Sequence, residues 1–236
     1  MNIRLATYNI HKFVGTDGRR SEPRILQIIS AMNADILALQ EFVLNDQSGN
    51  ISSVEAFAAK SGYDFIAQPM LRSNGMVQFN LLLSRIPVRT KNLVTLPRDG
   101  KEPRGVIDAQ FEIEGHRFRV AATHLGLTPG ARMRQLARIF ELHAGRDDEP
   151  FALLGDLNIM FPWEPARRRL QATFSGQKQP RAFPSRWPML AVDSIYFRRV
   201  QTNQSVRTFT DGAARRASDH LPLVADIGFS RPRDHK

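Results

Sequence analysis

Five apolar runs in this chain end on hydrogen-bonding side chains, and this arrangement constrains the fold more than any other sequence feature. In the clearest run, LLGDLN at 153–158, a carboxylate and then an amide follow the apolar residues. Side chains two positions apart on an extended chain point the same way, so Asp156 and Asn158 can face one site. The other runs end at Asn9, Glu41, His124 and the pair Asp219 and His220. We therefore expect polar side chains gathered at the ends of strands.

The spacing of apolar residues also predicts helices. One helix begins after Ser21 and buries an apolar stripe at helical spacing. That stripe consists of Ile25, Ile28, Ile29 and Met32. Another helix is expected at 129–143, capped by Thr128, with apolar residues inward and arginines largely outward. Those arginines are Arg132, Arg134 and Arg138.

Apolar runs and helical patterns alternate from end to end, which favours a single α/β domain. The middle of the chain consists of successive strand-like runs, and Glu114 with Gly115 forms a hairpin turn between two of them. Mixed strands joined by hairpins fit two packed β-sheets flanked by helices better than one parallel, doubly wound sheet. We expect one domain over 1–229, followed by a short basic tail at 230–236.

Composition narrows the protein class. The 236 residues are 42% hydrophobic and 24% charged, as in an ordinary globular protein. The absence of cysteine excludes disulfides, thiolate metal sites and a cysteine nucleophile. No apolar run reaches the roughly 18 residues that span a membrane, and the first residues lack a secretory-signal pattern. These features favour a cytoplasmic monomer.

The net charge is +10, from 33 Lys and Arg against 23 Asp and Glu. Such a charge favours polyanionic partners such as nucleic acids or anionic lipid surfaces, or it serves solubility alone. A long irregular segment at 160–189 contains Trp163, Trp187 and several arginines. A loop of that length in a compact domain is usually functional. The two tryptophans either stack bases or pack the loop onto the domain.

The polar strand ends suit metal-assisted chemistry. Burial would penalise the charge of Glu41 unless a cation or hydrogen bonds compensated it, and Mg²⁺ prefers carboxylate oxygens. Asn9 can bind the metal weakly or orient Glu41. Asp193 lies inside an apolar run, so its carboxylate needs a partner, and a histidine is a natural one. Each of these residues taken singly also fits an ordinary turn, surface or structural position, so the argument depends on their joint occurrence and order.

That order resembles the endonuclease/exonuclease/phosphatase superfamily of metal-dependent phosphoesterases, and the resemblance runs over 2–227. Its most specific elements are GDLN at 155–158 and SDH at 218–220. Supporting elements are YNI at 8–10, LQE at 39–41, NLLLS at 80–84, THL at 123–125 and VD at 192–193. The resemblance implies a DNase I-like, four-layer α/β sandwich, with two mixed sheets covered by helices and the site at one end.

The resemblance also implies roles for the polar residues. The ligands of Mg²⁺, for which Mn²⁺ is a substitute, would be Glu41, Asn9 and Asp219. The residues that contact the phosphate or the attacking water would be His124, Asn158, Asp156 and His220. Asp193 would hold His220. Whether Asp156 or His220 is the base stays open.

Other positions bear on the substrate. Many abasic-site endonucleases have different residues at the positions of Tyr8, His11 and Phe42, and the family often has a different residue at the position of Ser194. These differences weaken a DNA-repair assignment. The segments around His11, Arg104 and Phe183 look instead like uncharacterised bacterial members. Asn80, Arg104 and His11 are therefore expected on the phosphate side of the substrate, although an ordinary salt bridge or surface contact also explains Arg104 and His11.

Three functions follow from this interpretation. The first is a Mg²⁺-dependent phosphodiesterase that hydrolyses a P–O bond, acting on nucleic acid as an endonuclease or exonuclease. The second is the same chemistry on a phospholipid, a sphingomyelin-like lipid or a small soluble phosphoester. The third is a non-catalytic scaffold that binds nucleic acid. Salt dependence separates the first two, and metal binding through Glu41 separates both from the third.

Overall fold

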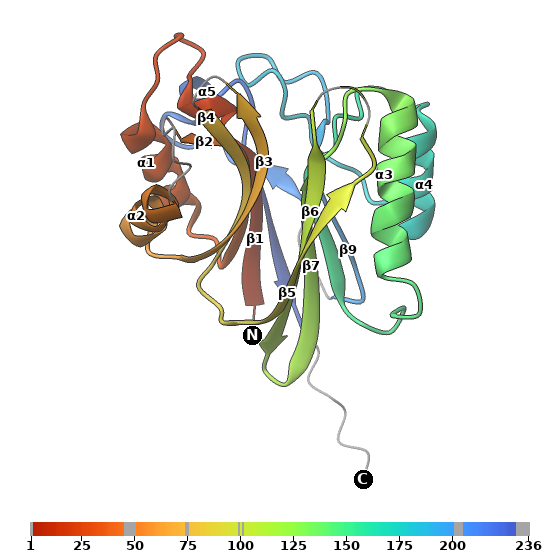
Figure 1. Cartoon of the computed structure of the whole chain (residues 1–236). Coiled ribbons are helices and arrows are strands. Elements are labelled where there is room, and N and C mark those ends of the chain that lie inside the picture. The colour runs from red at the N-terminus through yellow and green to blue at the C-terminus, as the bar shows by residue number, and fades with distance from the viewer. Residues whose placement is uncertain are drawn as a thin grey trace.

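Two β-sheets pack face to face in the computed structural model, which describes residues 2–44, 51–73, 76–98, 100, 102–200 and 205–229. Helices cover the outer face of each sheet, so the layers run helix, sheet, sheet, helix (Figure 1). The expected four-layer α/β sandwich with mixed sheets is thus confirmed. The predicted basic tail at 230–236 lies outside the described residues.

The first sheet has the strand order β10-β11-β1-β2-β4-β3. Its strands are β1 (Asn2–Asn9), β2 (Ile36–Leu44), β3 (Asp64–Ser73), β4 (Met76–Ser84), β10 (Arg207–Thr208) and β11 (Leu223–Gly228). β1 and β2 are parallel, and helix α1 (Glu22–Met32) makes the crossover between them. The other pairs in this sheet are antiparallel. Helices α1 and α2 (Ile51–Ser61) cover its outer face (Figure 1).

The second sheet has the order β5-β6-β7-β8-β9. Its strands are β5 (Val88–Leu96), β6 (Arg104–Ile113), β7 (His116–His124), β8 (Phe151–Asp156) and β9 (Asp193–Arg198). β7 and β8 are parallel, joined by α3 (Pro129–Leu142), and α4 (Pro165–Thr173) lies beside α3 on the outer face (Figure 1). Every residue of β8 is buried, as expected of a strand covered on both faces.

Local sequence determines where the helices begin. The hydroxyl of Ser21 accepts a hydrogen bond from the backbone N–H of Arg24, and that of Thr128 accepts one from Ala131. The expected stripe of α1 is buried. Two short helical segments near the site are η1 (His11–Phe13) and α5 (Ala214–Ala217). Among the described residues, no helix is long and apolar enough to cross a membrane.

Two expectations about the surface were wrong. Arg132 does not point outward: it is 3% exposed, and its guanidinium pairs with the carboxylate of Glu164. The segment at 160–189 is not wholly irregular, because it contains α4. The first error has a clear physical cause. The helix that supplies Glu164 packs against α3 from a distant part of the chain, and a buried arginine is stable when a carboxylate compensates its charge.

A buried ionic cluster stabilises the second sheet. Arg119 donates to both oxygens of Asp108 at 3.2 and 3.0 Å and to Glu149 at 2.9 Å, and His143 Nε2 lies 3.2 Å from Asp108. Burial alone would raise the pKa of Asp108, but His143 and Arg119 lower it below its ordinary value. Asp108 is therefore charged in the folded protein well below neutral pH.

Replacing Asp108 by alanine is expected to lower the free energy of unfolding by about 3 kcal/mol at neutral pH, because Arg119 loses a buried partner. Because the folded pKa is depressed, this stabilisation is fully present above the ordinary carboxyl pKa of about 3.9 and is lost as the pH falls through the lower folded value. Urea unfolding at several pH values measures both effects. The exposed pair Arg89–Glu112 provides the control, since Glu112→Gln should cost less than about 1 kcal/mol.

Candidate active site

Polar side chains from both sheets meet at the end of the sandwich opposite the N-terminus, the upper end in Figure 1. β1, β7 and β8 end there at Asn9, His124 and Asp156, and β9 begins there at Asp193. The strand register pairs Asp156 with His124 on one side and with Asp193 on the other. The meeting of polar strand ends expected from the sequence therefore occurs for Asn9, His124 and Asp156, whereas Glu41 is not a strand end, because β2 continues to Leu44.

Two backbone irregularities position side chains of the site. The register of β2 against β4 shifts between Leu39 and Phe42, and at this bulge Glu41 adopts a φ of 57°. A bulge of this kind re-aims a side chain, and Glu41 is partly exposed between buried neighbours. Gly155 has a φ of 145°, and a Cβ there would lie 1.9 Å from the carbonyl oxygen of Thr123. Only glycine, which has no Cβ, allows β8 to approach β7 so closely at the position before Asp156.

Asn9 connects the two principal carboxylates. Its amide nitrogen donates to Asp156 Oδ2 at 3.0 Å and to Glu41 Oε1 at 3.4 Å, and its amide oxygen accepts from the N–H of His11 at 3.0 Å. Asp156 Oδ1 also accepts from the N–H of Asn158 at 2.9 Å. In this arrangement Asn9 orients Glu41 and Asp156.

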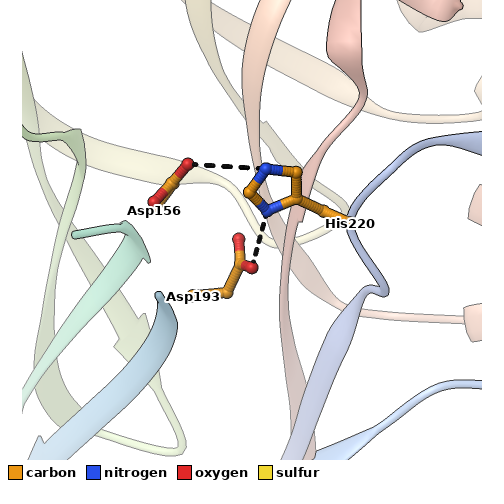
Figure 2. A group of neighbouring side chains, drawn as sticks. All are labelled: Asp156, Asp193 and His220. Atoms are coloured by element: carbon orange, nitrogen blue, oxygen red, sulfur yellow. Dashed lines mark hydrogen bonds and ion pairs between the residues drawn. The ribbon is translucent and has the colours of Figure 1, made fainter. Parts of the chain in front are cut away.

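Asp156, Asp193 and His220 form a buried triad, drawn in Figure 2. His220 Nδ1 is hydrogen-bonded to Asp193 Oδ2 at 2.8 Å, and His220 Nε2 lies 3.9 Å from Asp156 Oδ2. Burial opposes the charge of His220, but Asp193 and Asp156 raise its pKa to about 10. Burial raises the pKa of Asp193 to about 6. Burial also opposes ionisation of Asp156, but the charges of His124 and His220 lower its pKa.

The expected partner of Asp193 is thus found, and further imidazoles lie close by. His124 Nε2 is 3.6 Å from Asp156 Oδ2, and burial lowers the pKa of His124. Asp219 is partly exposed, with Oδ1 3.5 Å from His11 Nδ1 and 4.0 Å from His220 Nε2. The structure therefore brings His11 and Asp219 to the same cluster.

Two residues predicted to contact the phosphate, Asn80 and Arg104, have buried hydrogen-bond donors. Within the described residues, Asn80 Nδ2 and Arg104 Nε are buried without a partner, although Arg104 Nη2 donates to Glu102 at 2.7 Å. An unpaired buried donor is costly unless a ligand accepts from it. Arg104 lies close enough to His124 to help lower its pKa. Asn158 differs, because Nδ2 already donates to the carbonyl of Leu125 at 2.9 Å.

The residues present fit a hard divalent cation. Asp156, Asp193 and His220 each offer a ligand atom, and these atoms lie within 4.8 Å of one another. The facing atoms of His220 and Asp193 are already joined by their hydrogen bond. Because Mg²⁺ prefers oxygen ligands, Glu41, which is hydrogen-bonded to Asn9 and is paired with no histidine among the described residues, is the more suitable ligand.

The structure also reveals supporting residues that the sequence analysis missed. Ser218 Oγ donates to the carbonyl of Asn9 at 2.7 Å and accepts from the N–H of His220 at 3.2 Å, so it joins the end of β1 to the His220 loop. The ring of Phe183 lies 4.7 Å from that of His220, centroid to centroid. Both residues are in motifs that the resemblance includes, but their contacts span distant parts of the chain.

Arg167 also stabilises segments next to the site, and the sequence did not predict this role. It is one of the arginines of the segment at 160–189, and it is buried. Its guanidinium donates to the carbonyls of Ile159 and Ala191 at 2.8 and 2.6 Å and to the hydroxyl of Tyr196 at 3.2 Å. Arg167 thereby joins the loop after Asp156 to the segment before Asp193.

The family model described as the endonuclease/exonuclease/phosphatase family matches residues 6–220. The chain belongs to this family. The match contains every strand end that carries a site residue, from Asn9 to His220. As an endonuclease/exonuclease/phosphatase family protein, the chain is placed among hydrolytic phosphoesterases.

Similar proteins agree with this family assignment. The "Uncharacterized protein YbhP" of Escherichia coli (strain K12) is 29% identical in an alignment 249 positions long, which covers 96% of this chain and 96% of its own. An endonuclease/exonuclease/phosphatase from Beutenbergia cavernae has a TM-score of 0.79 at 22% identity, over 97% of this chain and 72% of its own. The human Nocturnin catalytic domain has a TM-score of 0.75 at 20% identity, over 97% of this chain and 95% of its own. These solved structures share the fold.

Proposed function

We propose that this protein is a Mg²⁺-dependent phosphodiesterase that hydrolyses a P–O bond of a nucleic acid by attack of water. The observation that carries the proposal is the position of the Asp156 carboxylate. It is buried, held by Asn9 and by the N–H of Asn158, and faced by His124 and His220. Charged and neutral donors arranged in advance around a reacting phosphoryl group are the main source of such catalysis.

Glu41 would hold the cation, with Asn9 and Asp219 beside it, and Mn²⁺ would substitute for Mg²⁺. When bound, the ion supplies positive charge that stabilises the negative charge on the phosphoryl oxygens and the leaving oxygen. His124, Asn80 and Arg104 would donate hydrogen bonds to the phosphate. Asn158 would stand next to it, with one N–H of its amide beyond the bond to Leu125.

The attacking water would contact both Asp156 and His220 from the side that these two groups face. Both face the same space, and their nearest atoms are 3.9 Å apart. Asp193 would act as a positioning residue, since its hydrogen bond fixes the orientation of the His220 ring. Either Asp156 or His220 takes the proton of the water, and the two assignments differ in their pH dependence.

Turnover assays with and without Mg²⁺ or Mn²⁺ test this function. The panel contains bis-p-nitrophenyl phosphate, plasmid DNA, abasic-site duplex, RNA and sphingomyelin vesicles, with Asp156→Ala as the control. Metal-dependent cleavage of a nucleic acid that the variant abolishes supports the proposal. Activity confined to vesicles or small esters retains the mechanism and changes the substrate. Wild-type protein that hydrolyses nothing in the panel, including the simple diester, contradicts the proposal.

An arginine-rich cavity near the site favours a polyanionic substrate. The cavity, of about 470 Å³, is lined by Asp17, Arg19, Arg20, Ser21, Arg24, Ala213 and Arg216. Its arginines outnumber its one aspartate, and the first turn of α1 adds the positive end of a helix dipole. Arg216 is four residues before His220, and its carbonyl accepts from the N–H of Thr16 at 3.1 Å. A phosphate next to the scissile one would meet positive charge here.

Replacing Arg216 by glutamine is expected to weaken nucleic-acid binding without changing the hydrolysis of bis-p-nitrophenyl phosphate. Its side chain is largely exposed, and its nearest carboxylate, Asp17, is 4.0 Å away. Loss of one phosphate contact should reduce the slope of log affinity against log salt by about 1. Arg117 at the far end of β7 provides the matched control, since Arg117→Gln should leave the slope unchanged. An unchanged slope in Arg216→Gln would remove this cavity from the binding surface.

A further inference from the structure

The large apolar side chains that are exposed gather at the catalytic end of the molecule. Within the described residues, six of the eight lie in the loops after β7 and β8 or shortly before β9. These six are Leu127, Met160, Phe161, Trp163, Trp187 and Met189. Trp163 is 66% exposed and Trp187 is 77% exposed, so neither packs its loop onto the domain. Exposed apolar clusters of this kind mark interaction surfaces.

The aromatic residues lie in segments that adjoin the site. The rings of Phe161 and Trp163 are stacked, with centroids 4.8 Å apart and an interplanar angle of 11°. They follow Asn158 in the loop that leaves β8. Trp187 lies in a loop held against the His220 segment, because the N–H of Ser185 donates to the carbonyl of Asp219 at 2.6 Å. One aromatic surface therefore follows Asp156, and the other lies beside Asp219.

Hydrogen bonds fix the backbone of the loop that carries the stacked pair. Glu164 is buried, and its Oε1 accepts from the N–H groups of Met160 and Phe161 at 3.0 and 3.1 Å. Its other oxygen pairs with Arg132, whose guanidinium also donates to the carbonyl of Leu127 at 2.6 Å. The loop is thus tied to α3 by a buried ion pair. A loop backbone fixed in this way loses little conformational entropy when a ligand stacks on the rings that the loop carries.

An exposed arginine accompanies each tryptophan, either bonded to its backbone or next to it in the chain. Arg168 is exposed, and its Nη2 donates to the carbonyl of Trp163 at 3.2 Å. Arg186 precedes Trp187 in the chain, is exposed, and donates to the carbonyl of Thr16 at 2.9 Å. Flat apolar rings next to fixed cations match a ligand that carries flat bases on an anionic backbone.

We propose that Phe161 with Trp163, and Trp187, stack the bases of a single-stranded nucleic acid on the two sides of the catalytic centre. This inference rests on the proposed phosphodiesterase function and specifies its substrate class. A single strand is required because bases inside a duplex are already stacked and cannot offer their faces to a protein ring. The neighbouring arginines then contact the phosphates between the stacked bases.

Intrinsic fluorescence tests the proposal directly, because Trp163 and Trp187 are the two tryptophans of the chain. Without divalent metal, a short oligothymidylate should quench the emission in a saturable manner. An oligonucleotide with the same number of phosphates but abasic sugars should leave the emission unchanged. Vesicles of phosphatidylglycerol provide the competing partner. A blue shift with vesicles and no quenching by the oligonucleotide would overturn the proposal and identify a lipid surface as the ligand.

Substitutions separate stacking from simple apolar contact. Trp163→Leu and Trp187→Leu keep apolar bulk but remove the ring, and each should weaken oligothymidylate binding by about tenfold to a hundredfold. Trp163→Phe should restore most of the affinity. Leu93→Ser, at an exposed apolar residue of β5, is the matched control and should have no effect.

Hydrolysis of bis-p-nitrophenyl phosphate distinguishes failure of this inference from failure of the proposed function. The leucine variants should hydrolyse this small diester at the wild-type rate. If they also bind the oligonucleotide as tightly as the wild type does, the stacking proposal is wrong and the phosphodiesterase stands. If the wild-type protein does not hydrolyse the diester, the proposed function itself has failed.

Discussion

Replacing Asp156 by alanine is expected to lower turnover by about 10³-fold to 10⁵-fold while leaving the protein folded. Asp156 is the point at which the site residues converge: it accepts from Asn9 and from Asn158, and it faces His124 and His220. His124 and His220 lower its pKa against the effect of burial, so it is ionised at neutral pH. Alanine removes this charge and the acceptor for Asn9 together. Steady-state rates on a simple diester and on nucleic acid measure the loss.

Stability is the second readout for this variant. A buried carboxylate placed for catalysis contributes little to folding and often opposes it, so Asp156→Ala should unfold at a denaturant concentration near that of the wild type. Asp108 on β6 is the matched buried aspartate. Asp108→Ala should show the opposite behaviour, with lowered stability and an unchanged rate per folded molecule. Wild-type activity in Asp156→Ala would refute the proposed role of this residue.

Replacing Asp193 by asparagine is expected to lower turnover by about 10²-fold to 10⁴-fold and to shift the pH profile. Asp193 holds His220 through a 2.8 Å hydrogen bond, and its charge is the main influence that raises the pKa of His220. Asparagine keeps the shape but removes the charge. The pKa of His220 must then fall, so the limb of the profile that belongs to His220 moves to lower pH.

The direction of this shift does not depend on which protonation state of His220 is active. If neutral His220 is the base, the rising limb moves to lower pH. If the imidazolium assists the phosphate or the leaving group, the falling limb moves to lower pH instead. Profiles of kcat/KM against pH for both proteins make the comparison. An unshifted profile would show that Asp193 does not act through the charge of His220. If the profile shifts, the limb that moves, rising or falling, shows whether neutral His220 is the base.

Much of the candidate site was predictable because its signals are local. An apolar run that closes on a polar residue does report a strand end at Asp156 and His124. The same interpretation fails in two places, since β2 continues past Glu41 to Leu44, and Asn158 lies beyond β8 with a φ of 55° rather than on an extended strand. The partner of Asp193 followed from the cost of leaving a carboxylate unpaired in an apolar strand, and that partner is His220. The bulge that aims Glu41 was not predictable, since it arises from pairing with β4.

The sequence by itself determined which segments form strands and which form helices. It also determined the polar residues that follow the apolar runs and the class of chemistry that those residues allow. These properties depend on side-chain identity and on short-range periodicity. Only the tertiary structure decided which side chains face water. Arg132 and Arg167 are buried because Glu164 and the carbonyls of Ile159 and Ala191 reach them, whereas Trp163 and Trp187 stay exposed beside the site. Exposure depends on partners that are distant in the chain, and no local pattern specifies them.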